Sequence, residues 1–231
     1  MISVIIPAYN EEAHLKTTIE KLWDLDEENL IQEVIVADGS SEDGTVSIAQ
    51  SAGVKVVTGD KGRAKQMNRG ASAAKGKILY FLHADSIPPK RFSTDIVNAH
   101  SKGYQSGCFR LAFDHDHWFL KANAWFTRFD VNAVRFGDQS LFVTKKLFEN
   151  AGGFREDLLM MEDQEIIHRI KRHGKFKVMN DYVTTSARKY LDNGVFRMQR
   201  IFYRIWALYY LGYSQEKLLE MHRKLIRNHK L

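Results

Sequence analysis

The chain has 231 residues, of which 44% are hydrophobic and 27% are charged, a composition typical of a globular protein and not of a disordered one. Its net charge of +6 fits a phosphate-bearing ligand, a nucleic acid or an anionic membrane surface, without choosing among them. The single cysteine, Cys108, excludes an intramolecular disulfide, and no apolar stretch reaches the roughly 18–20 residues that span a bilayer. Because the first residues form a strand pattern without the basic region of a signal peptide, we expect a cytoplasmic protein.

Short β-rich runs alternate with helical patterns along the first 110 residues. We expect strands at residues 3–7, 33–38, 54–59 and 77–85, and helices at 11–25, 43–53 and 62–76. This alternation indicates βαβ units and a parallel sheet, and the nearly continuous apolar runs indicate strands buried on both faces. Ligands of such sheets bind beyond the carboxyl ends of the strands, so the segments that follow the strands are the candidate binding loops.

The second half of the chain is less regular. We expect a strand at 106–114, an aromatic helix or covering loop at 116–129, a strand and short helix within 139–154, an amphipathic helix at 161–174, a strand at 175–179, and two helices from residue 195 onward that break near Gly212. No internal repeat, low-complexity tract or proline-rich hinge divides the sequence. We interpret residues 1–190 as one domain and residues 191–231 as a C-terminal helical extension packed on it.

Carboxylates follow several of the predicted strands. The loop after the first strand, AYNEE, has no glycine, so it lacks the phosphate cradle of a nicotinamide-binding Rossmann unit. Instead, Asp38 and Asp85 are expected to end two strands, and Glu162 and Asp163 to begin a helix. Since Mg²⁺ and Mn²⁺ are commonly held by one or two carboxylates together with substrate phosphates, an aspartate at a strand end and a diphosphate can jointly hold such an ion.

Four segments resemble a known family when taken together. VIIPAYNEE, VIVADGSSEDGT, GRAKQMNRGASAAKGKILYFLHAD and GGFREDLLMMEDQEIIHRIKRHGK follow one another as in the family 2 glycosyltransferases of GT-A fold. The chain looks closest to a bacterial subgroup called transferase 2, which is associated with radical-SAM or selenium-domain proteins. The resemblance implies an α/β fold with a Rossmann-like, mixed and mainly parallel sheet flanked by helices. It also implies inverting transfer of a sugar from a nucleotide diphosphate, expected to be UDP, to a hydroxyl acceptor.

The resemblance further implies roles for individual residues. Asp163, beside Glu162, is the expected general base, and Asp85 is the last acid of the family's metal motif, which implies Mn²⁺ or Mg²⁺ as the cofactor. The residues expected to bind the nucleotide sugar are Pro7, Ala8, Tyr9, Glu11, Asp38, Arg63, Lys65, Asn68, His83, Ala84, Asp85, Gly137, Asp138 and Arg188.

Two features depart from the family pattern. His83 stands where the family has the first acid of its metal motif, and an imidazole ligand there would favour Mn²⁺ over Mg²⁺. A histidine in this position can equally be packed or hydrogen-bonded without touching a metal. The Gln-x-x-Arg-Trp motif of processive members is absent, which argues for a single transfer. Arg188 and Lys189 offer cations for the diphosphate instead.

Asp163 also has a simpler interpretation, as an acid that is favoured at the start of a helix by the helix dipole.

The C-terminal extension combines aromatic and basic side chains. The basic ones are Arg197, Arg200, Arg204, Lys217, Arg223, Lys224, Arg227 and Lys230. Helices of this kind can lie on an anionic membrane surface, which would suit a lipid-linked acceptor. They can also pack on the domain or in a dimer, and packing is the arrangement we expect.

The acceptor, a small molecule or a lipid-linked one, and the oligomeric state stay open, and no nucleic-acid partner is expected. The alternative functions are a nucleotidyltransferase on a similar sheet, or a non-catalytic basic protein that binds a membrane surface or nucleic acid.

Overall fold

An eight-stranded sheet forms the centre of the protein in a computed structural model, which describes residues 1–135 and 137–226. The strands are β1 (Ile2–Ala8), β2 (Ile31–Asp38), β3 (Lys55–Thr58), β4 (Ile78–Phe81), β5 (Ser86–Ile87), β6 (Ser106–Phe113), β7 (Leu141–Thr144) and β8 (Phe176–Thr185), in the spatial order β3-β2-β1-β4-β7-β6-β8-β5. Adjacent strands from β3 to β4 are parallel, and so are β6 and β8. β7 is antiparallel to both of its neighbours, and β5 is antiparallel to β8. The expected mixed, mainly parallel sheet is confirmed.

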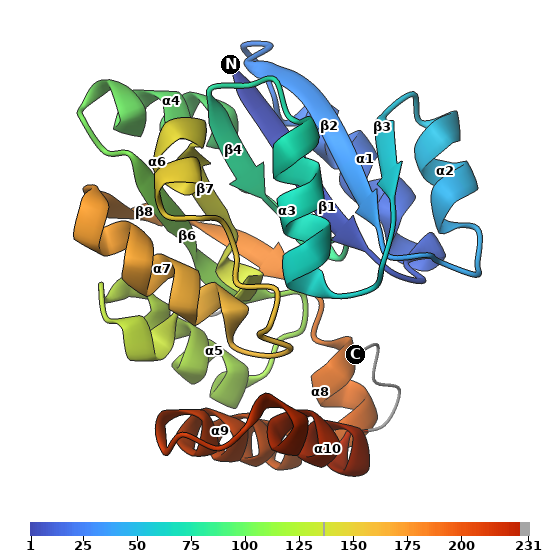
Figure 1. Ribbon diagram of the computed structural model, residues 1–231, viewed down its shortest axis with the longest axis vertical. Coiled ribbons are helices and arrows are strands. Elements are labelled where there is room, and N and C mark those ends of the chain that lie inside the picture. The colour runs from blue at the N-terminus through green and yellow to red at the C-terminus, as the bar shows by residue number, and fades with distance from the viewer. Residues whose placement is uncertain (136, 227–231) are drawn as a thin grey trace.

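Helices cover both faces of this sheet (Figure 1). They are α1 (Glu12–Asp24), α2 (Thr45–Ser51), α3 (Arg63–Ala73), α4 (Phe92–Ser101), α5 (Trp118–Trp125), α6 (Lys145–Asn150), α7 (Glu162–His173), α8 (Arg188–Asn193), α9 (Val195–Tyr210) and α10 (Gln215–Leu225), with 3-10 turns η1 (Phe126–Arg128), η2 (Asn132–Val134) and η3 (Gly137–Gln139). Side chains of β1 alternate between the faces, as the pleat requires. Ile6 packs in one core cluster with Leu15 of α1 and Ile96 of α4, whereas Ile5 packs in the other with Met67 of α3 and Ile166 of α7.

Helix α3 lies unusually close to β1. A Cβ atom on Gly70 would come within 2.4 Å of the Ile5 side chain, so this approach requires glycine. Near the start of the same helix, the Gln66 amide donates to the carbonyl oxygens of Ala8 at 2.6 Å and Ala37 at 3.0 Å. The N-terminus of α3 is thereby fixed beside the carboxyl ends of β1 and β2.

The prediction of a strand at 77–85 is wrong at the C-terminal end, because the observed strand ends four residues earlier. β4 stops at Phe81, and the chain then turns, with the Ser86 amide donating to the His83 carbonyl oxygen at 3.1 Å. The turn leaves Ser86 and Ile87 free to pair with Thr185 and Thr184 as β5. The last strand is longer than the predicted 175–179, because its extension to Thr185 pairs with both β5 and β6.

The C-terminal helices pack on one another at one end of the molecule (Figure 1). Met198, Ile201 and Ile205 of α9 form a cluster with Leu218 of α10. The tail contains two long helices separated around Gly212, as expected, and the additional helix α8 precedes them. The division into residues 1–190 and 191–231 stays a prediction, and Arg227 and Lys230 lie outside the described residues. Within the described ranges, the longest and most apolar helices still fall short of what a membrane crossing requires.

Candidate active site

Asp38 ends β2 and is completely buried. Its carboxylate accepts hydrogen bonds from the Ser41 hydroxyl at 2.5 Å and the Ser41 amide at 3.1 Å, which shapes the following turn. Each carboxylate oxygen has two lone pairs, so these bonds leave acceptor capacity for a ligand. Beside it, the β1 end carries Pro7, Ala8 and Tyr9, and the Lys61 ammonium lies 3.8 Å from the centre of the Tyr9 ring.

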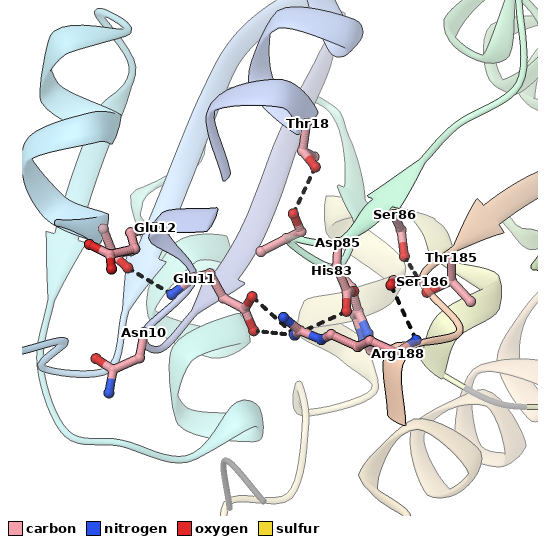
Figure 2. Close-up of polar contacts among 12 residues, drawn as sticks. Asn10, Glu11, Glu12, Thr18, His83, Asp85, Ser86, Thr185, Ser186 and Arg188 are labelled. Carbon is pink, nitrogen blue, oxygen red and sulfur yellow. Dashed lines mark hydrogen bonds and ion pairs between the residues drawn. The ribbon is translucent and has the colours of Figure 1, made fainter. Parts of the chain in front are cut away.

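Arg188 joins two acidic residues that are far apart in the sequence (Figure 2). Its guanidinium donates to the two carboxylate oxygens of Glu11 at 2.9 and 3.1 Å and lies 3.2 Å from Asp85 Oδ2. Glu11 and Arg188 are 177 positions apart. All three side chains are largely withdrawn from solvent, so the cation neutralises two acids where water screens them weakly.

Hydrogen bonds on both sides hold the turn that carries Asp85 (Figure 2). The Thr18 hydroxyl of α1 donates to the Ala84 carbonyl oxygen at 2.7 Å, and the Ser186 amide donates to the Asp85 carbonyl oxygen at 3.2 Å. Asp114, just past β6, accepts from the Ala187 amide at 2.8 Å and so fixes the residue that precedes Arg188. The roles of Gln66 and Asp114 are absent from the sequence predictions, because nothing local to either residue indicates its distant backbone partner.

His83 pairs with Asp138 across the same turn. The two groups approach to 3.0 Å between Nδ1 and Oδ1. Burial opposes charge on both, but the hydrogen bond raises the pKa of His83 and, with the charge of His83, holds the pKa of Asp138 well below its ordinary value. Lys189 lies nearby, and its pKa is lowered by burial and by the positive charge of Arg63. The imidazole of His83 is thus hydrogen-bonded to an acid from a distant segment of the chain.

Glu162 and Asp163 occupy the first turn of α7, and Arg63 from α3 faces both. Arg63 Nη1 lies 3.2 Å from Glu162 Oε1 and 3.7 Å from Asp163 Oδ2. Burial and the neighbouring Asp163 raise the pKa of Glu162 to about 7, and burial raises the pKa of Asp163. Met161, directly before the helix, has a left-handed backbone with φ of 68°, a strained conformation that is often found at functional sites.

Asp163 lies against Gly137 and a small apolar-walled cavity. A Cβ atom on Gly137 would come within 2.1 Å of Asp163 Oδ2, so any other residue there would displace the carboxylate. Phe81, Phe154 and Ile167 are among the cavity walls, which His83 also lines. These walls exclude water from one side of Asp163 and account for the raised pKa of its carboxyl group.

Two predicted site residues have their contacts elsewhere. Lys65 forms an exposed ion pair with Asp60 at 3.2 Å. The Asn68 amide donates to the Phe154 carbonyl oxygen at 2.8 Å and to Glu156 at 2.9 Å, and its oxygen accepts from the Phe154 amide. Asn68 therefore anchors the loop before α7, and neither side chain is drawn into the cluster around Arg63 and Arg188.

The residues around Asp85 are chemically suited to a divalent cation. Asp85 offers carboxylate oxygens, and His83 has its Nδ1 engaged by Asp138, which leaves Nε2 as the nitrogen available to an ion. Metal-binding histidines characteristically donate their other ring N–H to a carboxylate in this way. Among the described residues, no group of three or more histidine, cysteine or acidic side chains converges as a complete protein shell. Such an ion would therefore take further ligands from substrate or water.

Comparisons with known proteins show what this chain is similar to. Residues 3–155 match the model of the family described as glycosyl transferase family 2. Glucosyl-3-phosphoglycerate synthase of Mycobacterium tuberculosis is 33% identical over 97 residues, which cover 38% of this chain and 30% of that protein. Undecaprenyl-phosphate 4-deoxy-4-formamido-L-arabinose transferase of Aeromonas hydrophila is 30% identical over 132 residues, which cover 52% and 40%. The matched region thus spans less than half the length of these curated relatives.

Solved structures share the fold over nearly the whole chain. The mannosyltransferase PcManGT of Pyrobaculum calidifontis, in complex with GDP-Man and Mn²⁺, superposes with a TM-score of 0.71 at 17% identity, over 97% of this chain and 69% of that one. TarS 1–349 of S. aureus, in complex with UDP-GlcNAc, gives a TM-score of 0.67 at 16% identity, over 99% and 74%.

Replacing Arg63 with methionine should destabilise the protein in a pH-dependent manner. The change leaves Glu162 and Asp163 without their cation, and their folded-state pKa values should rise further. A carboxyl whose pKa is raised on folding loses stability as pH increases from its unfolded pKa to its folded pKa. We expect a loss of about 2 kcal/mol at pH 8 and a smaller one at pH 5, measured by urea unfolding. Lys65→Met, in an exposed pair of the same helix, is the control. A loss independent of pH would contradict the assignment.

Proposed function

The chain belongs to glycosyl transferase family 2, and from this premise we propose that it moves a sugar from a nucleoside diphosphate to a hydroxyl acceptor, with inversion at the anomeric carbon. The supporting observation is that Asp38 ends β2 and Asp85 follows β4, the two parallel neighbours of β1, with Arg188 beside Asp85 and Arg63 beside Asp163. Solved neighbours whose complexes contain GDP-Man or UDP-GlcNAc support this donor class, and we propose a UDP-sugar.

The two parts of the donor would meet different groups. Asp38 would accept a hydrogen bond from the base, with Pro7, Ala8 and Tyr9 forming the adjoining wall. Arg63, Arg188 and Lys189 would stabilise the negative charge that develops on the diphosphate as the bond to the sugar breaks. Arg63 and Arg188 already face carboxylates, so they are held in place before the donor arrives and need not be ordered by it.

Asp163 would remove the acceptor's proton. The hydroxyl oxygen attacks the anomeric carbon, its proton passes to the Asp163 carboxylate, and the nucleoside diphosphate leaves from the opposite face of the sugar. A carboxyl group with a raised pKa is a stronger base, which favours proton transfer near neutral pH. Glu162 accepts a hydrogen bond from Arg63 and would hold the guanidinium of Arg63 beside the reacting groups.

A divalent ion would be held by Asp85 and by His83 through Nε2. When bound, it would neutralise the leaving diphosphate as a Lewis acid. Structures of related fold contain Mn²⁺, which supports a divalent metal for this chain. Arg188 also contacts Asp85. The Asp85 carboxylate would therefore interact with both the arginine and the metal ion.

The acceptor is proposed only as a class. The curated relatives are named for phosphoglycerate and for undecaprenyl phosphate, a small molecule and a lipid. Either is compatible with a phosphate-bearing acceptor that approaches a basic chain. We propose a cytoplasmic enzyme, with peripheral contact at the inner face of the membrane through its C-terminal helices where the acceptor is lipid-linked.

The purified chain should release nucleoside diphosphate from a UDP- or GDP-sugar in the presence of Mn²⁺. Asp163→Asn should lower kcat at least about a hundredfold while donor binding persists, because only the proton acceptor is lost. Asp157→Asn, an exposed acid, is the control. Absence of both binding and turnover with every nucleotide sugar would contradict the proposed function.

The pH profile should reveal the two coupled acids. Because the base acts as a carboxylate and burial raises the pKa of Asp163, kcat/KM should fall on the acidic side at a higher pH than an ordinary aspartate would give. Glu162→Gln removes a negative charge beside Asp163, so the fall should move to lower pH. An unchanged profile in that variant would show that Glu162 does not influence the base.

His83→Asp should preserve nucleotide binding and change the choice of metal. An imidazole ligand favours Mn²⁺, whereas a second carboxylate suits Mg²⁺ as well. We expect the ratio of Mn²⁺ to Mg²⁺ affinity, titrated with nucleotide present, to fall. His83→Asn, which offers neither an imidazole nor a carboxylate, should bind both ions more weakly. If metal affinities are the same in all three proteins, His83 is no ligand.

A further inference from the structure

Helices α5 and α9 together form an exposed aromatic surface that the proposed chemistry does not use. Phe196 of α9 packs against Phe119 with ring centres 4.8 Å apart, and Tyr203 donates to Asn123 at 2.5 Å, so the two helices lie side by side. The exposed large side chains of α5, η1 and α9 are Trp118, Trp125, Phe126, Phe196, Tyr203 and Tyr210. We refer to these six residues as the aromatic surface.

The exposed side of α9 carries aromatic side chains in addition to the polar ones that a surface helix ordinarily presents. Met198, Ile201 and Ile205 form its buried face. Phe196 and Tyr203, seven positions apart and therefore on one stripe, are about half exposed, at 50% and 51%. Trp118 is more exposed still, at 67%. Aromatic residues gathered on one surface in this way mark an interaction site rather than scattered exposure.

All the charges on these elements are positive. α5, η1 and α9 contain no aspartate or glutamate, and their basic residues are Lys121, Arg128, Arg197, Arg200 and Arg204. The acids that flank these elements in sequence are Asp116, Asp130 and the exposed Asp192 of α8. Asp116 pairs with Lys121 at 2.7 Å, and Asp130 pairs with Lys171 and Arg135. Arg200 and Arg204 are exposed beside the aromatic rings.

We propose that the aromatic surface binds the anionic face of a lipid bilayer. Tryptophan and tyrosine favour the boundary between lipid headgroups and acyl chains, and arginine and lysine bind anionic headgroups. A second copy of the chain fits less well, because a symmetric dimer would place the same cations against one another. The positive charge selects anionic over neutral lipid.

The position of the surface relates it to the candidate active site. α8 carries Arg188 and leads within eight residues to Phe196, and Figure 1 shows α5, α8 and α9 together at the same end of the molecule. The site would then open close to the bilayer, where a lipid-linked acceptor is concentrated. This last step rests on the proposed function, whereas lipid binding itself does not.

Sedimentation of the full chain with vesicles tests the charge contribution. Binding should be strong to vesicles of phosphatidylcholine with about a third phosphatidylglycerol, weak to phosphatidylcholine alone, and reduced by salt. Each arginine near an anionic surface contributes on the order of 1 kcal/mol, so Arg200→Gln/Arg204→Gln should lower the partition coefficient about thirtyfold. Lys102→Gln/Lys146→Gln removes two exposed cations of other elements and should have a much smaller effect.

A second pair of variants tests the aromatic contribution. Trp118→Ser should weaken binding several-fold, whereas Trp23→Ser, which changes a 45%-exposed tryptophan on α1, should not. Equal binding by all variants, or no preference for anionic vesicles, would overturn the proposal. So would a dimer in solution that Trp118→Ser dissociates. The assay contains no donor, and so a failure here would leave transfer activity with a soluble acceptor intact.

Discussion

The structure depends on the neutralisation of a dense group of acids at one edge of the sheet. Glu11, Asp85, Asp138 and the adjacent pair Glu162 and Asp163 come from four separate segments, and in a poorly hydrated site they would repel one another strongly. Arg188, Arg63 and His83 are placed between them, each contacting an acid from a segment distant in sequence. The ion pairs therefore connect the two halves of the chain at the point where a donor would bind.

This arrangement explains why irregular backbone is concentrated near the site. The early end of β4 makes the turn that presents His83 and Asp85, and β5 then pairs with β8 so that Arg188 reaches Asp85. Met161 holds a left-handed backbone just before the two acids of α7. Such features weaken regular structure, and the surrounding hydrogen bonds and ion pairs offset that cost.

Much of the fold and part of the site follow from local sequence. Hydrophobic periodicity predicts β1, α1, β2 and α7 to within a few residues, and the strand-end rule directs attention to Asp38 and Asp85. Contacts between distant segments are not encoded locally. The helix-compatible run from Phe92 to Ser101 is missing from the predicted elements, and no pattern indicates that Asp114 would hold Ala187 or that Asn68 would anchor Phe154. The family resemblance places His83 in the metal motif, but only the structure reveals Asp138 as its partner.

A crystal structure with a nucleoside diphosphate and Mn²⁺ would test the central claim most directly. The account predicts the base against Asp38, the ion on Asp85 and His83, and the diphosphate beside Arg63, Arg188 and Lys189, with Asp163 facing the open side where an acceptor would enter. A nucleotide bound away from this edge of the sheet, or an ion held without Asp85, would contradict it.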